Sequence, residues 1–173
     1  EITDIKVLKK GMTNRSFLFT CNGQKYIMRI PGEGTDHLID RKQEAEVYQV
    51  IHDKGICDDI VYINPENGYK ITKYLENARV CDPLNEEDTY KCMCRLKAFH
   101  SMNLQVHHDF DIYKQIAFYE SLWDGKPSVY RDYQLTKTNV MKLKNYVEKH
   151  IEKRCLTHID AVPDNFLFVD DGS

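Results

Sequence analysis

Short apolar runs of the kind typical of β-strands dominate the first 75 residues of the chain. They come in two pairs, and each pair flanks a turn with an Asn-Gly dipeptide, Asn22-Gly23 in the first and Asn67-Gly68 in the second. Asn-Gly tolerates positive φ and is the strongest short-range signal of a β-hairpin. The predicted strands are residues 15–21, 24–30, 60–63 and 69–74. The pattern therefore predicts an antiparallel sheet.

A helical pattern separates the two hairpins. We expect this helix to run from Asp36 to Lys54, because apolar residues recur there at helical spacing and Gly55 follows as a stop signal. Its expected inner positions are Leu38, Ala45, Tyr48 and Ile51.

The apolar period becomes helical from Asn85 onward, and Asn85 can cap a helix whose first turn is acidic. Two further predicted faces are Ile112, Ile116, Tyr119 and Trp123, and then Val140, Leu143, Val147, His150 and Ile151. We expect the last helix to run directly into the segment that begins at residue 156. The fold class predicted is α+β, with a β-rich lobe at 1–75, a connection at 76–84, a helical lobe at 85–173 and a ligand cleft between the lobes.

Composition narrows the function classes. The 173 residues are 42% hydrophobic and 29% charged, which suits one ordinary domain or two small lobes. A net charge of −3 gives no reason to expect nucleic acid or an anionic membrane as a partner. No apolar run suits a bilayer or a signal peptide, so we expect a cytoplasmic protein without membrane insertion. Six cysteines without a C-x-x-C pair favour reduced structural thiols over disulfides or a zinc site.

The two ends of the sequence suggest a piece of a longer polypeptide. The chain opens on Glu1 without a methionine and closes on an apolar run, residues 166–169, followed by the turn-forming Asp-Asp-Gly. A hairpin turn implies a returning strand. We therefore expect more chain to follow, and we expect residues 166–169 to be an exposed edge in the isolated chain.

Small polar residues at the start of the sheet can approach a phosphate. They are Gly11, Thr13, Asn14 and Ser16, within the loop at 9–16. A simple hairpin loop explains the same composition. Arg29, at the end of the next strand, carries a permanent charge that can reach a phosphate, and Glu44 on the following helix can hold it in place. The alternative for each is a solvated surface charge.

The segment LTHIDAVPDNFLF, residues 156–168, places polar side chains at fixed spacing inside an apolar stretch. Asp160 and Asn165 are separated by the same interval as the aspartate and asparagine of the protein-kinase loop H-R-D-x-x-x-x-N. There the aspartate accepts or orients the attacking hydroxyl, and the asparagine binds magnesium. Two alternatives are a metal cluster of His158, Asp160 and Asp164, and a capped polar turn before a strand.

Five stretches, spread over nearly the whole chain, carry a resemblance to a known family. They are GMTNRSFLF (11–19), YIMRIPGEGTDHLIDRKQEAEVY (26–48), KITKYLENAR (70–79), LKAFHS (96–101) and HIDAVPDNFLF (158–168). On these stretches the chain resembles the choline kinases, closest to the bacterial choline kinases of phosphocholine metabolism. That family lies within the larger group of aminoglycoside phosphotransferase-like kinases.

The resemblance implies a protein kinase-like two-lobed fold with a truncated helical lobe, and transfer of phosphate from ATP to the hydroxyl of choline with Mg²⁺. It implies that the 11–16 loop covers the phosphates, that Arg29 contacts them with Glu44 as its positioner, and that a hinge at 73–75 binds adenine. The implied ATP-binding residues are Gly11, Thr13, Asn14, Arg15, Ser16, Arg29, Glu44, Lys73, Tyr74 and Leu75. Asp160 would be the catalytic base, Asn165 a magnesium ligand and His158 a structural organiser of the loop.

One departure from the family concerns the second magnesium-binding aspartate, which these kinases carry on the strand that returns from the hairpin. Asp170 and Asp171 lie in the turn itself, too soon after Asn165 to occupy that strand. We therefore expect the isolated chain to have little or no kinase activity. Two other functions stay open: a kinase of ethanolamine, an aminoglycoside or another small alcohol, and a catalytically silent nucleotide-binding module.

A wall for the trimethylammonium group of choline is expected in the segment FYESLW. Tyr119 and Trp123 stand four residues apart on one predicted helical face, with Glu120 beside them. Aromatic faces and a carboxylate suit this cation, because its methyl groups hide the charge from hydrogen bonds. The alternative is core packing of an amphipathic helix, which uses the same spacing.

Overall fold

The protein is described here by a computed structural model that covers residues 1–10, 14–35 and 38–169. Five residues named above, Gly11, Thr13, Asp36, Asp170 and Asp171, lie outside the described residues. The chain forms two compact units: the first comprises Glu1–Val106 and Leu156–Ser173, and the second comprises His107–Cys155. The division into lobes at residues 75 and 85 stays a prediction, because compactness groups the segment after residue 156 with the sheet.

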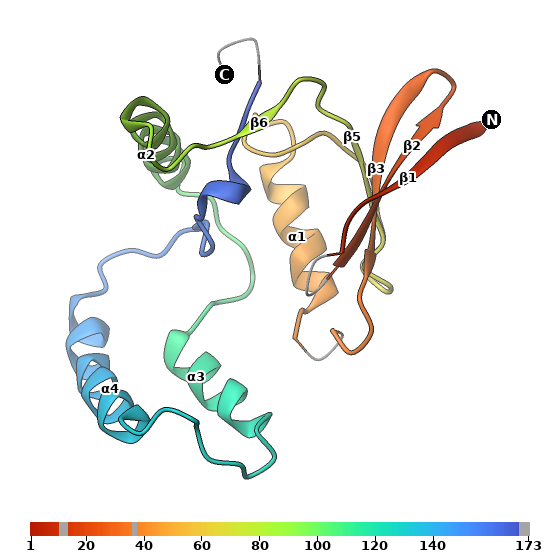
Figure 1. Ribbon diagram of the computed structural model, residues 1–173. Helices are drawn as coiled ribbons and strands as arrows, with labels where there is room; N and C mark the ends of the chain where they lie inside the picture. The colour runs from red at the N-terminus through yellow and green to blue at the C-terminus, as the bar shows by residue number, and fades with distance from the viewer. Residues whose placement is uncertain (11–13, 36–37, 170–173) are drawn as a thin grey trace. The chain divides into compact units, whose positions relative to one another are not determined.

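The first unit is built on a five-stranded antiparallel sheet in the order β1-β2-β3-β5-β4 (Figure 1). The strands are β1 (Ile2–Lys10), β2 (Asn14–Cys21), β3 (Gln24–Pro31), β4 (Ile60–Ile63) and β5 (Lys70–Lys73). Asn22 and Gly23 have φ values of 51° and 80° and close the β2–β3 hairpin, as predicted. Gly68 lies in a longer connection, where its amide donates to the carbonyl of Asn64 at 2.8 Å.

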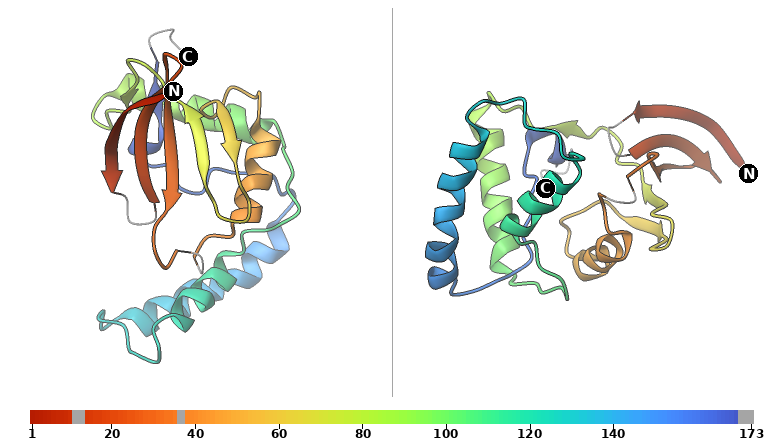
Figure 2. Two further views of the ribbon diagram at one scale, coloured as in Figure 1. Left: turned by 90° about the vertical axis from the view of Figure 1, so that its right-hand side faces the viewer. Right: turned by 90° about the horizontal axis from the view of Figure 1, so that it is seen from below.

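Helix α1 (Arg41–Ile51) lies on one face of this sheet (Figure 2) and begins later than predicted. The side chain of Asp40 caps it by accepting hydrogen bonds from two amides of the first turn. Leu38 therefore precedes the helix and is 42% exposed, so its prediction as an inner position is wrong. Three other predicted inner positions, Ala45, Tyr48 and Ile51, are buried or half-buried.

Helix α2 (Glu86–Ser101) begins at the predicted cap, because Asn85 Oδ1 accepts hydrogen bonds from the amides of Glu87 and Asp88. Just before it, the predicted connection contains a two-residue strand, β6 (Arg79–Val80), that was not predicted. This strand pairs with β7 (Leu167–Phe168) in a second antiparallel sheet. The strand predicted at 166–169 is thus present in shorter form and has a partner.

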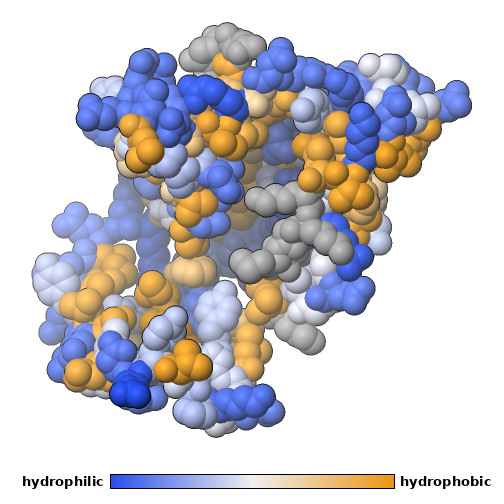
Figure 3. All heavy atoms as spheres, viewed as in Figure 1, coloured by the Kyte–Doolittle hydropathy of each residue, from blue (hydrophilic) through white to orange (hydrophobic). Residues whose placement is uncertain are grey.

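The second unit contains α3 (Ile112–Ser121) and α4 (Tyr133–His150). The structure contradicts two predictions here: Trp123 lies beyond the end of α3, and residues 151–162 form no helix, so α4 does not run into the segment at 156. Neither helix contains a buried residue, and the predicted inner position Leu143 is 56% exposed. Figure 3 shows apolar and polar residues mixed over one face of the molecule.

No helix in the described ranges has the length and apolar character needed to cross a membrane. All six cysteines are free thiols.

Candidate active site

The predicted Asp–Asn pair is brought into contact by a tight loop. A single 3₁₀ turn, Pro163–Asn165, follows Asp160 closely, and the Val162 amide donates to the Asp160 carbonyl at 3.0 Å. Asn165 then turns back, and its Nδ2 donates to the carbonyl of Asp160 at 2.7 Å and to its Oδ2 at 3.1 Å. Both side chains are exposed, so a ligand can reach the Oδ1 atom of each residue. We call residues 158–165 the Asp–Asn loop.

His158, the first residue of the Asp–Asn loop, makes a ring contact with Phe166, the residue that follows the loop. Its imidazole stacks on the ring of Phe166 with the centroids 6.2 Å apart. Among the described residues, which include His158, Asp160 and Asp164, no three His, Cys, Asp or Glu side chains are grouped to hold a metal ion. The metal-cluster alternative for this segment is therefore wrong.

The strand cation and its helix partner also meet as predicted. Arg29 on β3 lies with its Nη2 2.6 Å from Oε1 of Glu44 on α1. The two side chains are only 15% and 18% exposed, so the solvated-charge alternative does not describe them. The side chains of Arg29 and Glu44 thus form a half-buried ion pair between β3 and α1.

A second arginine, which the sequence analysis missed, shares this glutamate. Arg41 is buried in the first turn of α1, and its Nη1 donates to Oε2 of Glu44 at 3.1 Å. Its Nη2 donates to the hydroxyl of Thr35, which in turn donates to the carbonyl of Gly32 at 2.7 Å. The only sequence signal was its position three residues before Glu44, on the same helical face.

The charge balance of this cluster suits an anion. Two guanidinium groups share one carboxylate, which leaves an excess of one positive charge. The Nε atoms of Arg29 and Arg41 are buried and have no hydrogen-bond partner among the described residues. Buried donors normally find a partner, so these two donors are unsatisfied in the cluster.

The described part of the predicted phosphate loop lies next to this cluster. Asn14, Arg15 and Ser16 begin β2, and Ser16 pairs directly with Arg29 across the β2–β3 ladder. Arg15 is exposed and lies 3.5 Å from Glu33. The sheet register therefore places the hydroxyl-bearing residue and the cation side by side.

Two backbone amides of the predicted hinge already donate hydrogen bonds within the first unit. The amides of Lys73 and Tyr74 donate to the carbonyls of Asp59 and Lys25, at 2.9 and 3.1 Å. The Lys73 ammonium also binds the Asp59 carboxylate at 2.9 Å, and this hydrogen bond raises the pKa of Lys73. If residues 73–75 bind adenine, as predicted, their backbone can offer it only the carbonyls and the Leu75 amide.

Glu120, the charged residue of the predicted ammonium wall, already has a cationic partner within the second unit. Glu120 accepts hydrogen bonds from Lys137 at 2.5 and 2.7 Å and from the Tyr133 hydroxyl at 2.8 Å, and these bonds, that of Lys137 first, lower its pKa. Trp123 packs against Tyr133 with the ring centroids 5.0 Å apart. Tyr119 is 48% exposed. The geometry favours packing for Trp123 and an ion pair for Glu120, while the wall itself stays a prediction.

These features define a class: a kinase-like α+β fold whose sheet carries an Arg–Glu pair and whose later segment carries an Asp–Asn loop. A model of the choline/ethanolamine kinase family matches residues 5–172, and the chain belongs to this family. Protein LicA from Haemophilus influenzae is 28% identical over 167 residues, which cover 93% of this chain and 49% of that protein. The predicted family is thus confirmed.

Solved structures agree in fold. Choline kinase LicA from Streptococcus pneumoniae superposes with a TM-score of 0.86 and 26% identity, over 99% of this chain and 61% of that one. A LicA structure in complex with AMP gives a TM-score of 0.82 at 26% identity, over 100% of this chain and 60% of that one. The predicted kinase-like fold is confirmed, and the chain spans only between 49% and 61% of the length of these relatives.

Proposed function

We propose that the protein containing this chain transfers the γ-phosphate of ATP to the hydroxyl of choline and forms phosphocholine. The observation that carries the proposal is the direct contact of Asp160 with Asn165, at the spacing that phosphoryl-transfer loops use. The LicA structures support it, since one is a choline kinase and another holds AMP.

Asp160 would take the proton of the attacking hydroxyl. Its Oδ2 accepts a hydrogen bond from Asn165, so Oδ1 is the oxygen that faces the alcohol. The hydrogen bond from Asn165 restrains the orientation of this carboxylate, which would align the hydroxyl before reaction.

Magnesium, when bound, would neutralise charge between the transferring phosphates. Asn165 suits such an ion, because its Nδ2 is committed to Asp160 and its Oδ1 is left as a hard oxygen ligand. The Arg29–Glu44–Arg41 cluster would attract the phosphates through its excess of one positive charge. Ser16, beside Arg29, would add a hydroxyl donor.

Ethanolamine is the second candidate substrate, because the family that matches this chain is described by both alcohols. The two differ by three methyl groups on nitrogen, so a site for choline needs aromatic or apolar walls where a site for ethanolamine needs hydrogen-bond acceptors. An aminoglycoside and a catalytically silent nucleotide-binding module are the further outcomes.

The test uses the full-length gene product that contains this chain. Steady-state rates with choline, ethanolamine and an aminoglycoside should give the highest kcat/KM for choline. Asp160→Asn should lower kcat by roughly 10²- to 10⁴-fold, the usual contribution of a general base, while ATP binding stays within twofold. Near-normal turnover in Asp160→Asn would overturn the role of the loop, and ATP binding without turnover of any alcohol would support the silent module.

A further inference from the structure

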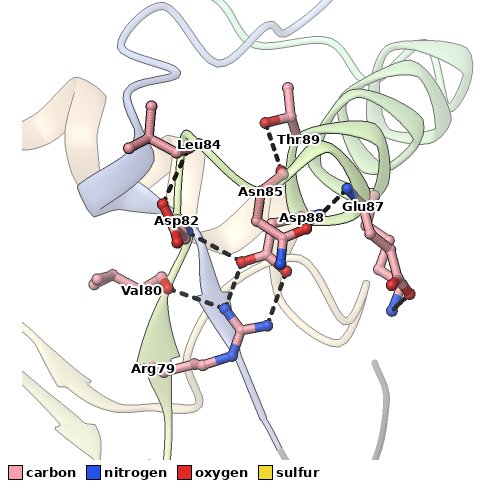
Figure 4. Close-up of polar contacts among 9 residues, drawn as sticks. Arg79, Val80, Asp82, Leu84, Asn85, Glu87, Asp88 and Thr89 are labelled. Carbon is pink, nitrogen blue, oxygen red and sulfur yellow. Dashed lines mark hydrogen bonds and ion pairs between the residues drawn. The ribbon is translucent and has the colours of Figure 1, made fainter.

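One ion pair connects α2 to the short strand β6 (Figure 4). Asp88 in the first turn of α2 is 3% exposed and is the one buried carboxylate among the described residues. It accepts two hydrogen bonds from the guanidinium of Arg79, at 2.5 and 2.8 Å, and a third from the backbone amide of Asp82 at 3.0 Å. Asp88 therefore binds the chain on both sides of Val80.

The strand held by Asp88 is the strand that pairs with β7. Arg79 lies opposite Phe168, and its guanidinium sits over the Phe168 ring at 4.5 Å from the centroid. Val80 lies opposite Leu167, and the Cys81 amide donates to the carbonyl of Phe166 at 3.1 Å. Arg79 thus touches both the buried carboxylate and the aromatic ring of β7.

β7 follows the Asp–Asn loop almost without a break. The Phe166 amide donates to the Pro163 carbonyl at 3.1 Å, and the preceding residue is Asn165 itself. Because Asn165 is so close to β7 along the chain, a displacement of β7 would also displace Asn165. The ladder between β6 and β7 is only two residues long, and so short a pair is not stable by itself.

We propose that the Arg79–Asp88 ion pair is a positioning device that holds β6 against β7 and so fixes the Asp–Asn loop. This role rests on the proposed function, because the loop it fixes is the one assigned to phosphoryl transfer. The bidentate geometry matters, since two parallel hydrogen bonds set the angle of the guanidinium as well as its distance. In this proposal both residues act through the loop and not through a contact with the substrate.

Three variants of the full-length protein test the device. Asp88→Asn keeps the size of the side chain and removes its charge, and Arg79→Lys keeps the charge and removes the fork. Glu87→Gln is the matched control, because Glu87 is the preceding residue of α2 and its exposed ion pair with Lys91 has no link to β6. Displacing a catalytic group slightly costs roughly 10- to 100-fold in rate. We expect Asp88→Asn to lose that much kcat with the KM for ATP within twofold, Arg79→Lys to lose less, and Glu87→Gln to match wild type.

A double-mutant cycle separates positioning from general destabilisation. If Asp88 acts through Asp160, then Asp88→Asn should lower kcat severalfold less in an Asp160→Asn background than in the wild type. The same loss in both backgrounds would refute the device, as would a kcat for Asp88→Asn equal to that of Glu87→Gln.

Hydrogen exchange tests the device without any activity. The amides of Val162, Asn165 and Phe166 are bonded inside the loop, so they should exchange at least tenfold faster in Asp88→Asn and in Arg79→Lys than in Glu87→Gln. Equal exchange in all three would refute the positioning role even in an inactive protein. Absence of phosphotransfer by the wild type, together with faster exchange in the two variants, would instead refute the proposed function and keep the device.

Discussion

Glu44 holds two arginines at once, so its charge can be removed with a calculable result. Its Oε1 lies 2.6 Å from Arg29 and its Oε2 lies 3.1 Å from Arg41. In Glu44→Gln the side chain keeps its size, but each guanidinium loses its counter-ion and the two positive charges face each other across a half-buried amide. We expect both protein stability and nucleotide affinity to fall.

The magnitude follows from the two contacts. The hydrogen bond from Arg41 to the Glu44 carboxylate is charge-assisted and contributes about 1.5–3 kcal/mol, and the ion pair with Arg29 loses its attraction when the carboxylate becomes an amide. The Arg29 and Glu44 side chains are 15% and 18% exposed, so solvent screening reduces the loss. We expect the free energy of unfolding to drop by about 2 kcal/mol. If Arg29 is also misplaced by one weakened contact, the KM for ATP should rise about tenfold, which corresponds to about 1.4 kcal/mol.

The assay combines urea denaturation with steady-state kinetics on the full-length protein. Glu66→Gln is the matched control, since Glu66 pairs with Lys42 at 3.4 Å while both side chains are more than 70% exposed. An exposed pair contributes about 0–1 kcal/mol, so this variant should resemble wild type. Glu44→Gln with the stability and ATP KM of Glu66→Gln would refute both the buried ion cluster and its phosphate role.

Three further outcomes are expected. Gly68 has a φ of 68°, and a Cβ there would lie 2.6 Å from Arg41 Cδ. Gly68→Ala should therefore lower the free energy of unfolding by more than the roughly 1–2 kcal/mol that a left-handed alanine costs, and thermal unfolding can measure this loss. Hydrogen bonds from the Arg79 side chain and from the Asp82 amide hold the pKa of Asp88 at about 2, below its unfolded value. The stability that Asp88 contributes is therefore complete above about pH 4 and is lost as pH falls toward 2, and acid unfolding of Asp88→Asn should not show this loss. Trp123 packs on Tyr133, so Trp123→Leu should lower the melting temperature and leave the KM for choline unchanged, whereas a severalfold rise in the KM for choline with an unchanged KM for ATP would assign Trp123 to the ammonium wall.

Local signals account for what the sequence predicted well. The Asn22-Gly23 hairpin and the Asn85 cap are each determined by a few neighbouring residues, and both are present in the structure. Two of the failures concern the boundaries of helices. Periodicity continued through Leu38 and Trp123, but Asp40 caps α1 after Leu38, and α3 ends before Trp123, where an Asp-Gly pair with positive φ follows. Both stop signals are present in the sequence, and they determine the ends of the helices more strongly than the spacing of apolar residues does.

The candidate site divides along a different line. Asp160 and Asn165 were predictable because one loop fixes their interval, so spacing in the sequence reports spacing in space. No sequence pattern marked Arg79 and Asp88. Their proposed role depends on the pairing of residue 79 with residue 168, and strands of two residues are too short to show a recognisable pattern of alternation. Reacting groups of this kind can share one short segment, whereas the groups that orient them come from any element that packs nearby. If the exchange and kinetic tests support the Arg79–Asp88 device, then sequence spacing identifies the reacting residues of such a loop, and only the fold identifies the residues that hold it in place.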